Sequence, residues 1–564
     1  MSQMNIIVVG GVACGSKTAA RLKRILPDSK VTLVERGENI SYDRWGLPQY
    51  IGSTIKDVND LMRTTWDAIR TPELFKSIKD VDTLVGWDAI EIKRDNKKLV
   101  VKNLASDEVR ILPYDKLVLA TGARYVKPQI EGLNAKGVFE IRTPSDSVKL
   151  QEYLKDGVDS AVLLGSNLFG MELVEAIANW GVQVTVIESD DHVMPTMLDK
   201  DIAATVQDYM EKEDIVVKVS TIVKEIKTDG DNKIRSIVTD QGEIACDLLL
   251  YDYGIIPEIH LAEEAGIEVN EGIVVNEYLQ TSDPDIYAGG DCVRVKNRIS
   301  DELVVATMGD TSNKHGRIIA TNIAQNNTQR FEGIVGSSLY KIFDWTIGKV
   351  GLTSNEAEKL GFDVVTCVVP GPDISHFIPG KKLVMFKTIA DKKSKRILGV
   401  QIVGPGHVDK RIDTMAAAFS MNPQLIAQDM ANLDLAYSVS LSPAVDNIHA
   451  NANVIQNEID GYAHSYDFFE ALEKLNDDDV TFVDLRIDEE VEILPFETRN
   501  YHHIPLEELN ARLDELPRDK EVVVFCVLCT RGFDGQAILE RAGFSNVHFI
   551  KGGILFWPFK KYLS

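Results

Sequence analysis

Residues Asn5–Arg24 read NIIVVGGVACGSKTAARLKR, and this stretch decides the fold of the first part of the chain. A short apolar run leads into a glycine turn and a helix, and the strand that follows ends in Glu35. Gly10, Val12 and Gly15 occupy the three glycine positions of a dinucleotide fingerprint. Glycine lets the backbone approach a pyrophosphate, the helix N-terminus favours negative charge, and the acid can accept from a ribose hydroxyl. The stretch therefore predicts a strand–helix–strand unit that binds a dinucleotide.

A second copy of the pattern lies at 160–189, which reads SAVLLGSNLFGMELVEAIANWGVQVTVIES. Gly165 and Gly170 hold the outer glycine positions, Asn167 takes the middle one, and Glu188 ends the following strand. An acid at that strand end favours an unphosphorylated ribose, because a 2′-phosphate would face a carboxylate. The second unit therefore predicts NADH rather than NADPH.

Two further strand ends join these halves, one at Thr121-Gly122 and one at Asp291 in the sequence AGGDC. An aspartate in such a place can hold a ribityl hydroxyl. In this order the four signals resemble the two-dinucleotide-binding flavoprotein family. The resemblance implies an α/β fold with FAD in a first domain and NAD in a second domain inserted within it. It assigns FAD to Gly10, Val12, Gly15, Glu35, Arg36, Thr121, Gly122 and Asp291, and NAD to Gly165, Gly170 and Glu188.

Mixed strand and helix signals at 331–446 resemble the α+β interface domain through which such flavoproteins form homodimers. The segment NLDLAYSVSLSPAVDNIH is similar to one in the coenzyme A disulfide reductase branch. In that branch a tyrosine reaches the partner subunit's flavin site, and Tyr437 holds its position. After a linking segment at 447–465, the strand and helix pattern at 466–564 resembles a rhodanese, an α/β sulfur-transfer domain.

The stretch EVVVFCVLCTRGF, residues 521–533, carries the chemistry of this tail. A strand delivers Cys526 into a loop that also holds Arg531 and opens a helix. A helix N-terminus lowers the pKa of a thiol and stabilises a thiolate or persulfide. Cys529 forms a C-x-x-C with Cys526, a spacing that can close into a reactive disulfide; the alternative is that Cys529 is only a small loop residue. We expect no metal, because a second ligand pair is missing.

Flavoproteins with such a tail resemble rhodanese-fused coenzyme A disulfide reductases and NADH-dependent persulfide reductases. The resemblance implies that NADH reduces FAD, that FAD reduces a cysteine paired with coenzyme A, and that the rhodanese cysteine handles sulfane sulfur. It divides the chain into an FAD domain (1–150 and 277–330), an NAD domain (151–276), a dimerisation domain (331–446), a linker (447–465) and a rhodanese-like domain (466–564).

The segment ISYDRWGLPQYIG, residues 40–52, departs from the redox motif of that family, Ser-x-x-Asn-Cys-Gly-Leu-Pro-Tyr-Tyr. Arg44 replaces the asparagine and Trp45 replaces the redox cysteine, although the flanking positions match. An indole cannot form a mixed disulfide. A second family segment appears as ISHFIPG at 374–380, with Phe377 and Ile378 in place of two tyrosines. We therefore expect that the ordinary disulfide-reductase route does not run at this flavin.

Basic residues follow the first glycine turn on its helix. In the family this helix face helps to hold the phosphates of coenzyme A, so Arg21, Arg24, Ser41 and Arg44 are candidate substrate-binding residues. A solvated helix face is the alternative. Cys526, Cys529, Arg531, Tyr437 and Trp45 are the candidate catalytic residues.

The overall composition limits the kinds of molecule that the protein is expected to bind and the setting in which it is expected to work. The 564 residues carry a formal net charge of −25, which disfavours nucleic acid and anionic membranes as general partners. Six cysteines in so long a chain fit a reduced, cytoplasmic setting better than a disulfide framework. We see no secretory signal at the start and no apolar run long enough for a bilayer.

Three functional hypotheses stay open at this point. The first is an NADH-dependent flavoenzyme of sulfur metabolism, in which electrons pass directly to the substrate or to a Cys526–Cys529 pair. The second is a reductase that gives a hydride to an organic acceptor such as a coenzyme A thioester, with Tyr437 as proton donor. The third is an electron donor to a protein partner, or a redox-sensing sulfur carrier.

Overall fold

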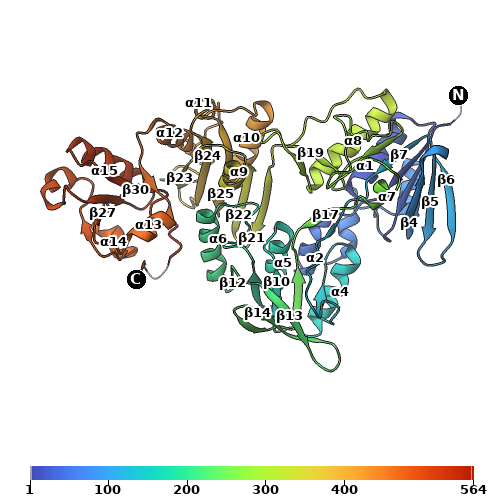
Figure 1. The fold of residues 1–564 in the computed structure, drawn as a ribbon, viewed down its shortest axis with the longest axis horizontal. Helices are drawn as coiled ribbons and strands as arrows, with labels where there is room; N and C mark the ends of the chain where they lie inside the picture. The colour runs from blue at the N-terminus through green and yellow to red at the C-terminus, as the bar shows by residue number, and fades with distance from the viewer. Residues whose placement is uncertain (1–2, 560–561, 564) are drawn as a thin grey trace. The chain divides into compact units, whose positions relative to one another are not determined.

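A parallel sheet forms around the first glycine turn (Figure 1). Its strands lie in the order β18-β7-β1-β2-β3, and each neighbouring pair is parallel. Most β1 side chains are buried, which explains why this strand is an unbroken apolar run. Helices α1 and α8 pack against one another. The elements are β1 Asn5–Val9, α1 Ala13–Ile25, β2 Lys30–Glu35, β3 Val81–Val85, β7 Lys116–Leu119, β18 Ile286–Ala288 and α8 Gly309–Gln325.

The second glycine turn lies in another parallel sheet, in which β11, β10, β16 and β9 follow one another. Helix α5 follows β10 directly after the turn. Two three-stranded antiparallel sheets, β4-β5-β6 and β13-β14-β15, also belong to this part of the chain. The elements are β4 Trp87–Lys93, β5 Lys98–Asn103, β6 Val109–Pro113, β9 Val138–Phe139, β10 Ser160–Leu164, α5 Leu168–Ala178, β11 Gln183–Ile187, β13 Val223–Thr228, β14 Ile234–Thr239, β15 Gly242–Ala245 and β16 Leu248–Tyr251.

The computed structural model describes residues 3–559 and 562–563 and divides into two units. Unit 1 comprises Met1–Ile187 and Thr221–Ile334, and unit 2 comprises Glu188–Ser220 and Val335–Ser564. The segment Glu188–Ser220, which follows the second dinucleotide strand, therefore belongs to the unit that holds the C-terminal domains.

Unit 2 contains an antiparallel sheet in the order β21-β22-β25-β24-β23. Nearly every side chain of β24 and β25 is buried, because helices cover this sheet. Helix α10 packs on β22 and β25, and α6 also contacts β25. The elements are α6 Lys200–Lys212, β21 Ser338–Ile342, β22 Trp345–Gly351, α9 Ser354–Lys359, β23 Val364–Pro372, β24 Leu383–Asp391, β25 Ile397–Gly404 and α10 Val408–Met421.

The segment 447–465, for which we predicted a linker, consists mostly of helix α12 (Asn447–Asp460). Ile448, Ala452, Ile455 and Ile459 are buried, at spacings of one helical turn. The helix packs on β23 and β24. This segment is therefore a packed helix of unit 2, because its apolar residues follow the helical period inside an otherwise polar sequence.

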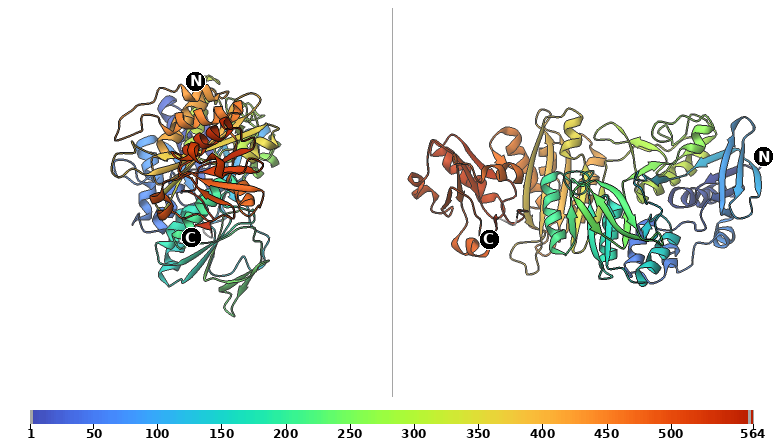
Figure 2. Two further views of the ribbon diagram at one scale, coloured as in Figure 1. Left: turned by 90° about the vertical axis from the view of Figure 1, so that its left-hand side faces the viewer. Right: turned by 60° about the horizontal axis from the view of Figure 1, so that its bottom comes forward.

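The C-terminal domain of unit 2 is a parallel sheet in the order β26-β30-β29-β27-β28, shown in orange and red in Figures 1 and 2. It is attached to the antiparallel sheet and to α6 by specific contacts. The Gly552 N–H donates to the carbonyl of Val368 at 3.0 Å, and the Thr205 hydroxyl donates to Phe556 O at 3.0 Å. The elements are β26 Ser465–Tyr466, α13 Phe468–Lys474, β27 Val480–Asp484, α14 Asp488–Ile493, β28 Tyr501–His503, β29 Glu521–Phe525, α15 Thr530–Arg541 and β30 Val547–Ile550.

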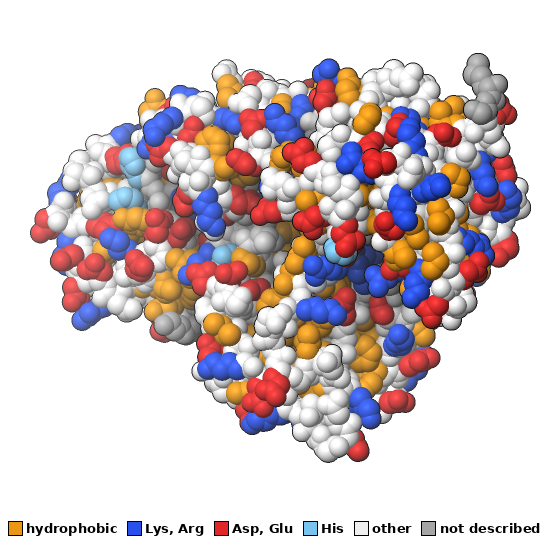
Figure 3. Space-filling view, turned by 45° about the vertical axis from the view of Figure 1, so that its right-hand side comes forward, with side chains coloured by type: hydrophobic (Ala, Val, Ile, Leu, Met, Phe, Trp, Pro, Cys, Tyr) orange, Lys and Arg blue, Asp and Glu red, His pale blue; other side chains and the backbone are white. Residues whose placement is uncertain are grey.

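The surface carries charges of both signs. On the face drawn in Figure 3, acidic and basic side chains are interspersed, with hydrophobic side chains between them. None of the helices in the described part of the chain combines the length and the hydropathy needed to cross a bilayer.

Candidate functional site

The first glycine turn is built so tightly that its glycines cannot be replaced. Gly10 has a φ of +96°, and a Cβ placed on it would lie 2.1 Å from the carbonyl oxygen of Ala120. A Cβ on Gly15 would lie 1.8 Å from the carbonyl oxygen of Gly10. Val12, half-buried, is the N-cap of α1, and no side chain caps this end of the helix. The first amides of α1 are therefore available to an anion such as a pyrophosphate.

Glu35 lies beside this turn and is held in place by two amides. Its carboxylate accepts from Gly11 N at 2.6 Å and from Gly37 N at 2.7 Å. The next residue, Arg36, is exposed. Glu35 thus presents an acceptor at the end of β2, where a ribose hydroxyl would be recognised.

The two other predicted strand ends lie at the same edge of the first sheet. The Thr121 hydroxyl donates to Glu258 O at 2.6 Å, and Gly122 has a φ of +73°. Asp291 accepts from the hydroxyl of Ser312 at 3.2 Å. Burial raises the pKa of Asp291, so its carboxyl gains from a hydroxyl partner. A close backbone turn, an uncapped helix start and a buried acceptor together fit the pyrophosphate and ribityl chain of FAD.

The segment that would carry the redox cysteine forms a short 3-10 helix, η1 (Arg44–Gly46), capped by Asp43. The Trp45 ring meets the Phe169 ring edge to face, with centroids 5.7 Å apart. The guanidinium of Arg44 lies 4.7 Å from the centroid of the same Phe169 ring. It also donates to the hydroxyl of Tyr125 at 2.7 Å. This wall consists of aromatic rings and a cation and contains no thiol.

A second cation, Arg142, completes this wall. Burial lowers its pKa first, and the neighbouring charge of Arg44 lowers it further. Arg142 also lies near the Thr121-Gly122 turn, since a Cβ placed on Gly122 would be 3.7 Å from Arg142 Nη2. Among the described residues, Arg44 Nε and Arg142 Nη1 are buried and have no hydrogen-bond partner. Two buried guanidinium donors without acceptors mark a place for an anion or a polarised oxygen.

The second glycine turn is organised around Asp252, which directly follows β16. Gly165 has a φ of +85°, and its Cβ would lie 2.4 Å from the carbonyl oxygen of Asp252. Gly170 N donates to the carboxylate of Asp252 at 2.8 Å, and the Asn167 amide donates to the Asp252 carbonyl at 2.7 Å. Asn167 thus folds back onto the sheet, which leaves the turn open. Glu188, which directly follows β11, is buried and accepts from Asp190 N at 3.1 Å.

The candidate substrate-binding residues occupy different environments. Arg21 donates to the hydroxyl of Thr321 at 3.1 Å, and its pKa is lowered by burial and then by Arg317 and Arg24. Arg24 is exposed. Ser41 has a φ of +52°, and its N–H donates to Gly11 O at 2.8 Å, which ties the Arg44 segment to the first glycine turn.

The C-terminal loop brings together Cys526, Cys529 and Arg531. Cys526 directly follows β29 and is buried, and its carbonyl accepts from Ile554 N at 3.0 Å. Arg531 lies in the first turn of α15, pairs with Glu490 at 2.7 Å, and interacts with the Cys526 thiol. Cys529 is the N-cap of α15, with a φ of +79°, and its thiol donates weakly to Val368 O at 3.8 Å.

Other predicted residues remain apart from these groups. Tyr437 is 57% exposed, between α11 (Ala427–Ala431) and α12, and Phe377 is also exposed. All six cysteines are free and buried. No group of three or more potential metal ligands occurs in the described part of the chain.

Four residues of the site in unit 1 were not predicted from the sequence, namely Arg142, Asp252, Tyr125 and Phe169. For Arg142 and Asp252 a local sequence pattern could have indicated the position. Arg142 directly precedes Thr143, which forms a capping box with Asp146 at the start of α4 (Pro144–Lys155). Asp252 directly follows the buried strand β16, much as Asp291 comes shortly after the buried strand β18. The contacts of Tyr125 and Phe169 with Arg44 join distant segments, and no local sequence pattern indicates them.

Comparison with protein-family models matches three parts of the chain. Residues 4–309 match "Pyridine nucleotide-disulphide oxidoreductase". Residues 338–446 match "Pyridine nucleotide-disulphide oxidoreductase, dimerisation domain". Residues 469–558 match "Rhodanese-like domain".

Similar proteins cover most or all of the chain. A Pyrococcus abyssi protein named "NAD(P)H sulfur oxidoreductase (CoA-dependent)" is 32% identical over 80% of this chain and 98% of its own. A solved structure of a "NAD-Dependent Persulfide Reductase from A. fulgidus" is 38% identical, with a TM-score of 0.93 over 98% of this chain and 100% of that one. The structure of reduced Bacillus anthracis CoADR-RHD is 29% identical, with a TM-score of 0.91 over 100% of this chain and 99% of that one.

Proposed function

Because the chain belongs to the pyridine nucleotide-disulphide oxidoreductase family and carries its dimerisation domain and a rhodanese-like domain, we propose that it is an NADH-dependent flavoenzyme of sulfur metabolism. Its acceptor is a sulfur compound or a coenzyme A-linked compound. The names of the similar proteins support this class, since they describe sulfur and persulfide reductases and a dependence on CoA.

The family uses FAD and NAD(P)H. Bound FAD supplies the transfer of an electron pair from a nicotinamide to an acceptor. The first glycine turn, Glu35 and Asp291 hold FAD, and Gly165, Gly170 and Glu188 hold NADH. Glu188 makes NADH the preferred donor, because its carboxylate disfavours a 2′-phosphate.

One observation carries the proposed route: the position of the redox cysteine is filled by Trp45, beside Arg44 and Arg142. An indole forms no bond to sulfur, so the acceptor binds at this wall without a covalent link to the protein. Cleavage of a sulfur–sulfur bond leaves negative charge on sulfur. The unpartnered donors on Arg44 and Arg142 stabilise such a charge as it develops.

The rhodanese-like loop carries sulfane sulfur on Cys526. Cys526 directly follows β29 in the loop that leads into α15, and its thiol contacts Arg531. Arg21, Arg24 and Ser41 form the second part of the substrate site, where the two arginines attract the phosphates of coenzyme A. Leu441 and Val445 are exposed and lie close to Tyr437 in sequence. In the proposed homodimer, the second subunit covers this segment.

A second function is favoured by the same wall. Two guanidinium groups also suit the carbonyl oxygen of a thioester, whose charge grows when a hydride reaches the conjugated carbon. In that function the enzyme reduces an enoyl-coenzyme A acceptor, and Cys526 takes no part in turnover.

Anaerobic stopped-flow measurement separates the two functions. The protein is reduced with NADH and mixed with coenzyme A persulfide, polysulfide, coenzyme A disulfide or an enoyl-coenzyme A, and flavin absorbance reports reoxidation. Fast reoxidation by persulfide or polysulfide is expected. Reoxidation by the enoyl compound alone supports the second function, and a flavin that no acceptor reoxidises contradicts both.

An arginine variant tests the wall itself. Arg44→Met is expected to lower kcat/KM for the preferred acceptor by at least about tenfold, which corresponds to ~1.4 kcal/mol of transition-state stabilisation. The rate of flavin reduction by NADH stays unchanged. Arg124→Met is the matched control, because Arg124 is 62% exposed and adjoins Tyr125 in sequence. Equal acceptor kinetics in the two variants would remove Arg44 from the site.

A further inference from the structure

The rhodanese-like loop holds a cysteine in a backbone conformation that favours glycine. Cys529 adopts the left-handed region, with φ +79° and ψ −25°. A residue with a Cβ is disfavoured in this region relative to glycine. Glycine would therefore fit this backbone conformation better. The group that Cys529 has and glycine lacks is the thiol.

That thiol belongs to a pair. Cys526 and Cys529 lie at the two sides of one tight loop between β29 and α15, and both are free and buried. They interact electrostatically: burial raises the pKa of Cys529, and Cys526 is the next cause. A C-x-x-C spacing at a helix start can close into a reactive disulfide.

We propose that Cys526 and Cys529 act as a dithiol that reduces the sulfane sulfur carried on Cys526 and releases it as sulfide. The proposal rests on the carrier role of Cys526 in the proposed function. It adds an activity of the rhodanese-like loop that needs neither NADH nor the flavin for one turnover.

The step balances in atoms and electrons. Cys529 Sγ attacks Cys526 Sγ, and the bond between Cys526 Sγ and the sulfane sulfur breaks. The sulfane sulfur takes the electron pair, receives the proton of the Cys529 thiol and leaves as hydrosulfide. The two cysteines are oxidised to a disulfide, and two molecules of a low-molecular-weight thiol reset the loop and are themselves oxidised to a disulfide.

The thiol of Cys529 can give up its present hydrogen bond at little cost. Its present bond to Val368 O is 3.8 Å long and weak, as expected for a thiol donor. The same carbonyl also accepts from Gly552 N at 3.0 Å, so it keeps a partner when the thiol leaves. Arg531 contacts Cys526, so its positive charge lies beside the persulfide anion on which the step begins.

A neighbouring cysteine provides the control. Cys367 lies on β23, is buried, and also interacts with Cys529. Its thiol donates to Asn451 O and to Asn451 Oδ1, each at 3.6 Å, and it is not part of the loop. A Cys367→Ala variant therefore removes a buried neighbour of Cys529 and leaves both thiols of the proposed pair in place.

The test is a single turnover of the full-length protein under anaerobic conditions. The protein is loaded with polysulfide, freed of excess reagent, and followed without added thiol by sulfide release and by intact mass. Wild type and Cys367→Ala are expected to release sulfide in proportion to the sulfur loaded and to lose the mass of two hydrogens. Cys529→Gly and Cys529→Ser are expected to keep the added sulfur until a thiol is supplied.

Cys529→Gly separates chemistry from folding, because glycine suits the left-handed backbone and leaves the melting temperature equal or higher. Sulfide release by Cys529→Gly at the wild-type rate would overturn the proposal, as would a wild-type protein that keeps its persulfide. A wild-type protein that takes up no sulfur on Cys526 would overturn the carrier role as well. Reoxidation of the flavin by acceptors is measured separately and does not depend on this outcome.

Discussion

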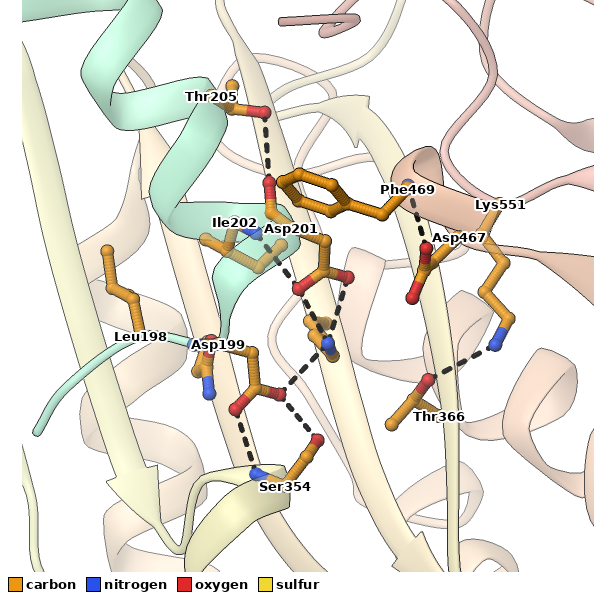
Figure 4. Close-up of polar contacts among 12 residues, drawn as sticks. Leu198, Asp199, Asp201, Ile202, Thr205, Ser354, Thr366, Asp467, Phe469 and Lys551 are labelled. Carbon is orange, nitrogen blue, oxygen red and sulfur yellow. Dashed lines mark hydrogen bonds and ion pairs between the residues drawn. The ribbon is translucent and has the colours of Figure 1, made fainter. Parts of the chain in front are cut away.

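Lys387 is the cation of a buried ion cluster in unit 2, and its removal gives a prediction that can be worked out from the structure. The two carboxylates of this cluster, Asp199 and Asp201, are labelled in Figure 4. The Lys387 ammonium lies 2.9 Å from Asp199 and 2.7 Å from Asp201. The three side chains are 5%, 8% and 5% exposed, respectively. Burial alone lowers the pKa of Lys387, but Asp199 and Asp201 raise it above the ordinary value, so the lysine stays charged. The cluster joins β24 to the start of α6.

Lys387→Met replaces the side chain by an apolar one of similar length and leaves two buried carboxylates without their cation. Breaking a buried pair in this way costs about 3–5 kcal/mol. Asp199 retains the N–H and the hydroxyl of Ser354 as donors, which places the expected loss near ~3 kcal/mol. Helix α6 also donates to the C-terminal domain through Thr205, so that domain is expected to loosen together with the cluster.

Urea unfolding followed by circular dichroism measures the loss, and limited proteolysis reports release of the C-terminal domain. Lys393→Met is the control, since Lys393 is 79% exposed and its substitution should change stability by less than about 0.5 kcal/mol. The double variant Lys387→Met/Asp201→Asn should recover part of the loss, because one uncompensated charge is removed. A loss below ~1 kcal/mol for Lys387→Met, or no recovery in the double variant, would refute the reasoning.

Two further predictions concern unit 1. Burial, followed by Glu175 and Asp43, raises the pKa of Glu172 from 4.5 to about 7. The folded protein therefore keeps a proton that the unfolded chain loses, and stability should fall by about 3 kcal/mol as the pH rises from about 4.5 to about 7. Thermal melts of Glu172→Gln over this range should lack that slope, and an unchanged slope would contradict the assignment. Gly15→Ala should lose bound flavin, measured as absorbance per chain, because its Cβ would lie 1.8 Å from a carbonyl, whereas Gly230→Ala should keep it.

The family and the fold class predicted from the two glycine turns are confirmed by the comparisons. These features could be predicted because each depends on a short stretch of chain. Gly10 and Gly15 are required by the local turn, and Glu35 is fixed by the length of one strand–helix–strand unit. The strand order β18-β7-β1 then brings the carboxyl ends of three distant strands to one sheet edge, as parallel pairing requires.

Other features depend on contacts that no short pattern records. Arg142 becomes part of the wall only because the segment after β9 returns to the segment of Arg44. The segment that contains Asp199 and Asp201 belongs to unit 2, where both carboxylates pair with Lys387. Lys387 lies nearly two hundred residues later in the chain. Helix α12 was hidden by its composition: polar residues outnumber apolar ones, although the apolar ones keep the period of a helix.

On the proposed route Trp45 stands where the family has its redox cysteine, and this changes what the rest of the chain has to provide. A redox cysteine fixes its substrate by a covalent bond, and without it the substrate must be positioned by noncovalent contacts alone. Arg44 and Arg142 can do this for an anion or a polarised oxygen, but they offer little to a neutral disulfide. In the proposed function, Cys526 is then the residue that forms covalent bonds to sulfur. A persulfide can leave as sulfide only when two electrons reach it, and a loop with a single thiol would wait for an outside donor. In our proposal Cys529 supplies those electrons within the loop, which would explain why this strained position carries a thiol instead of a glycine.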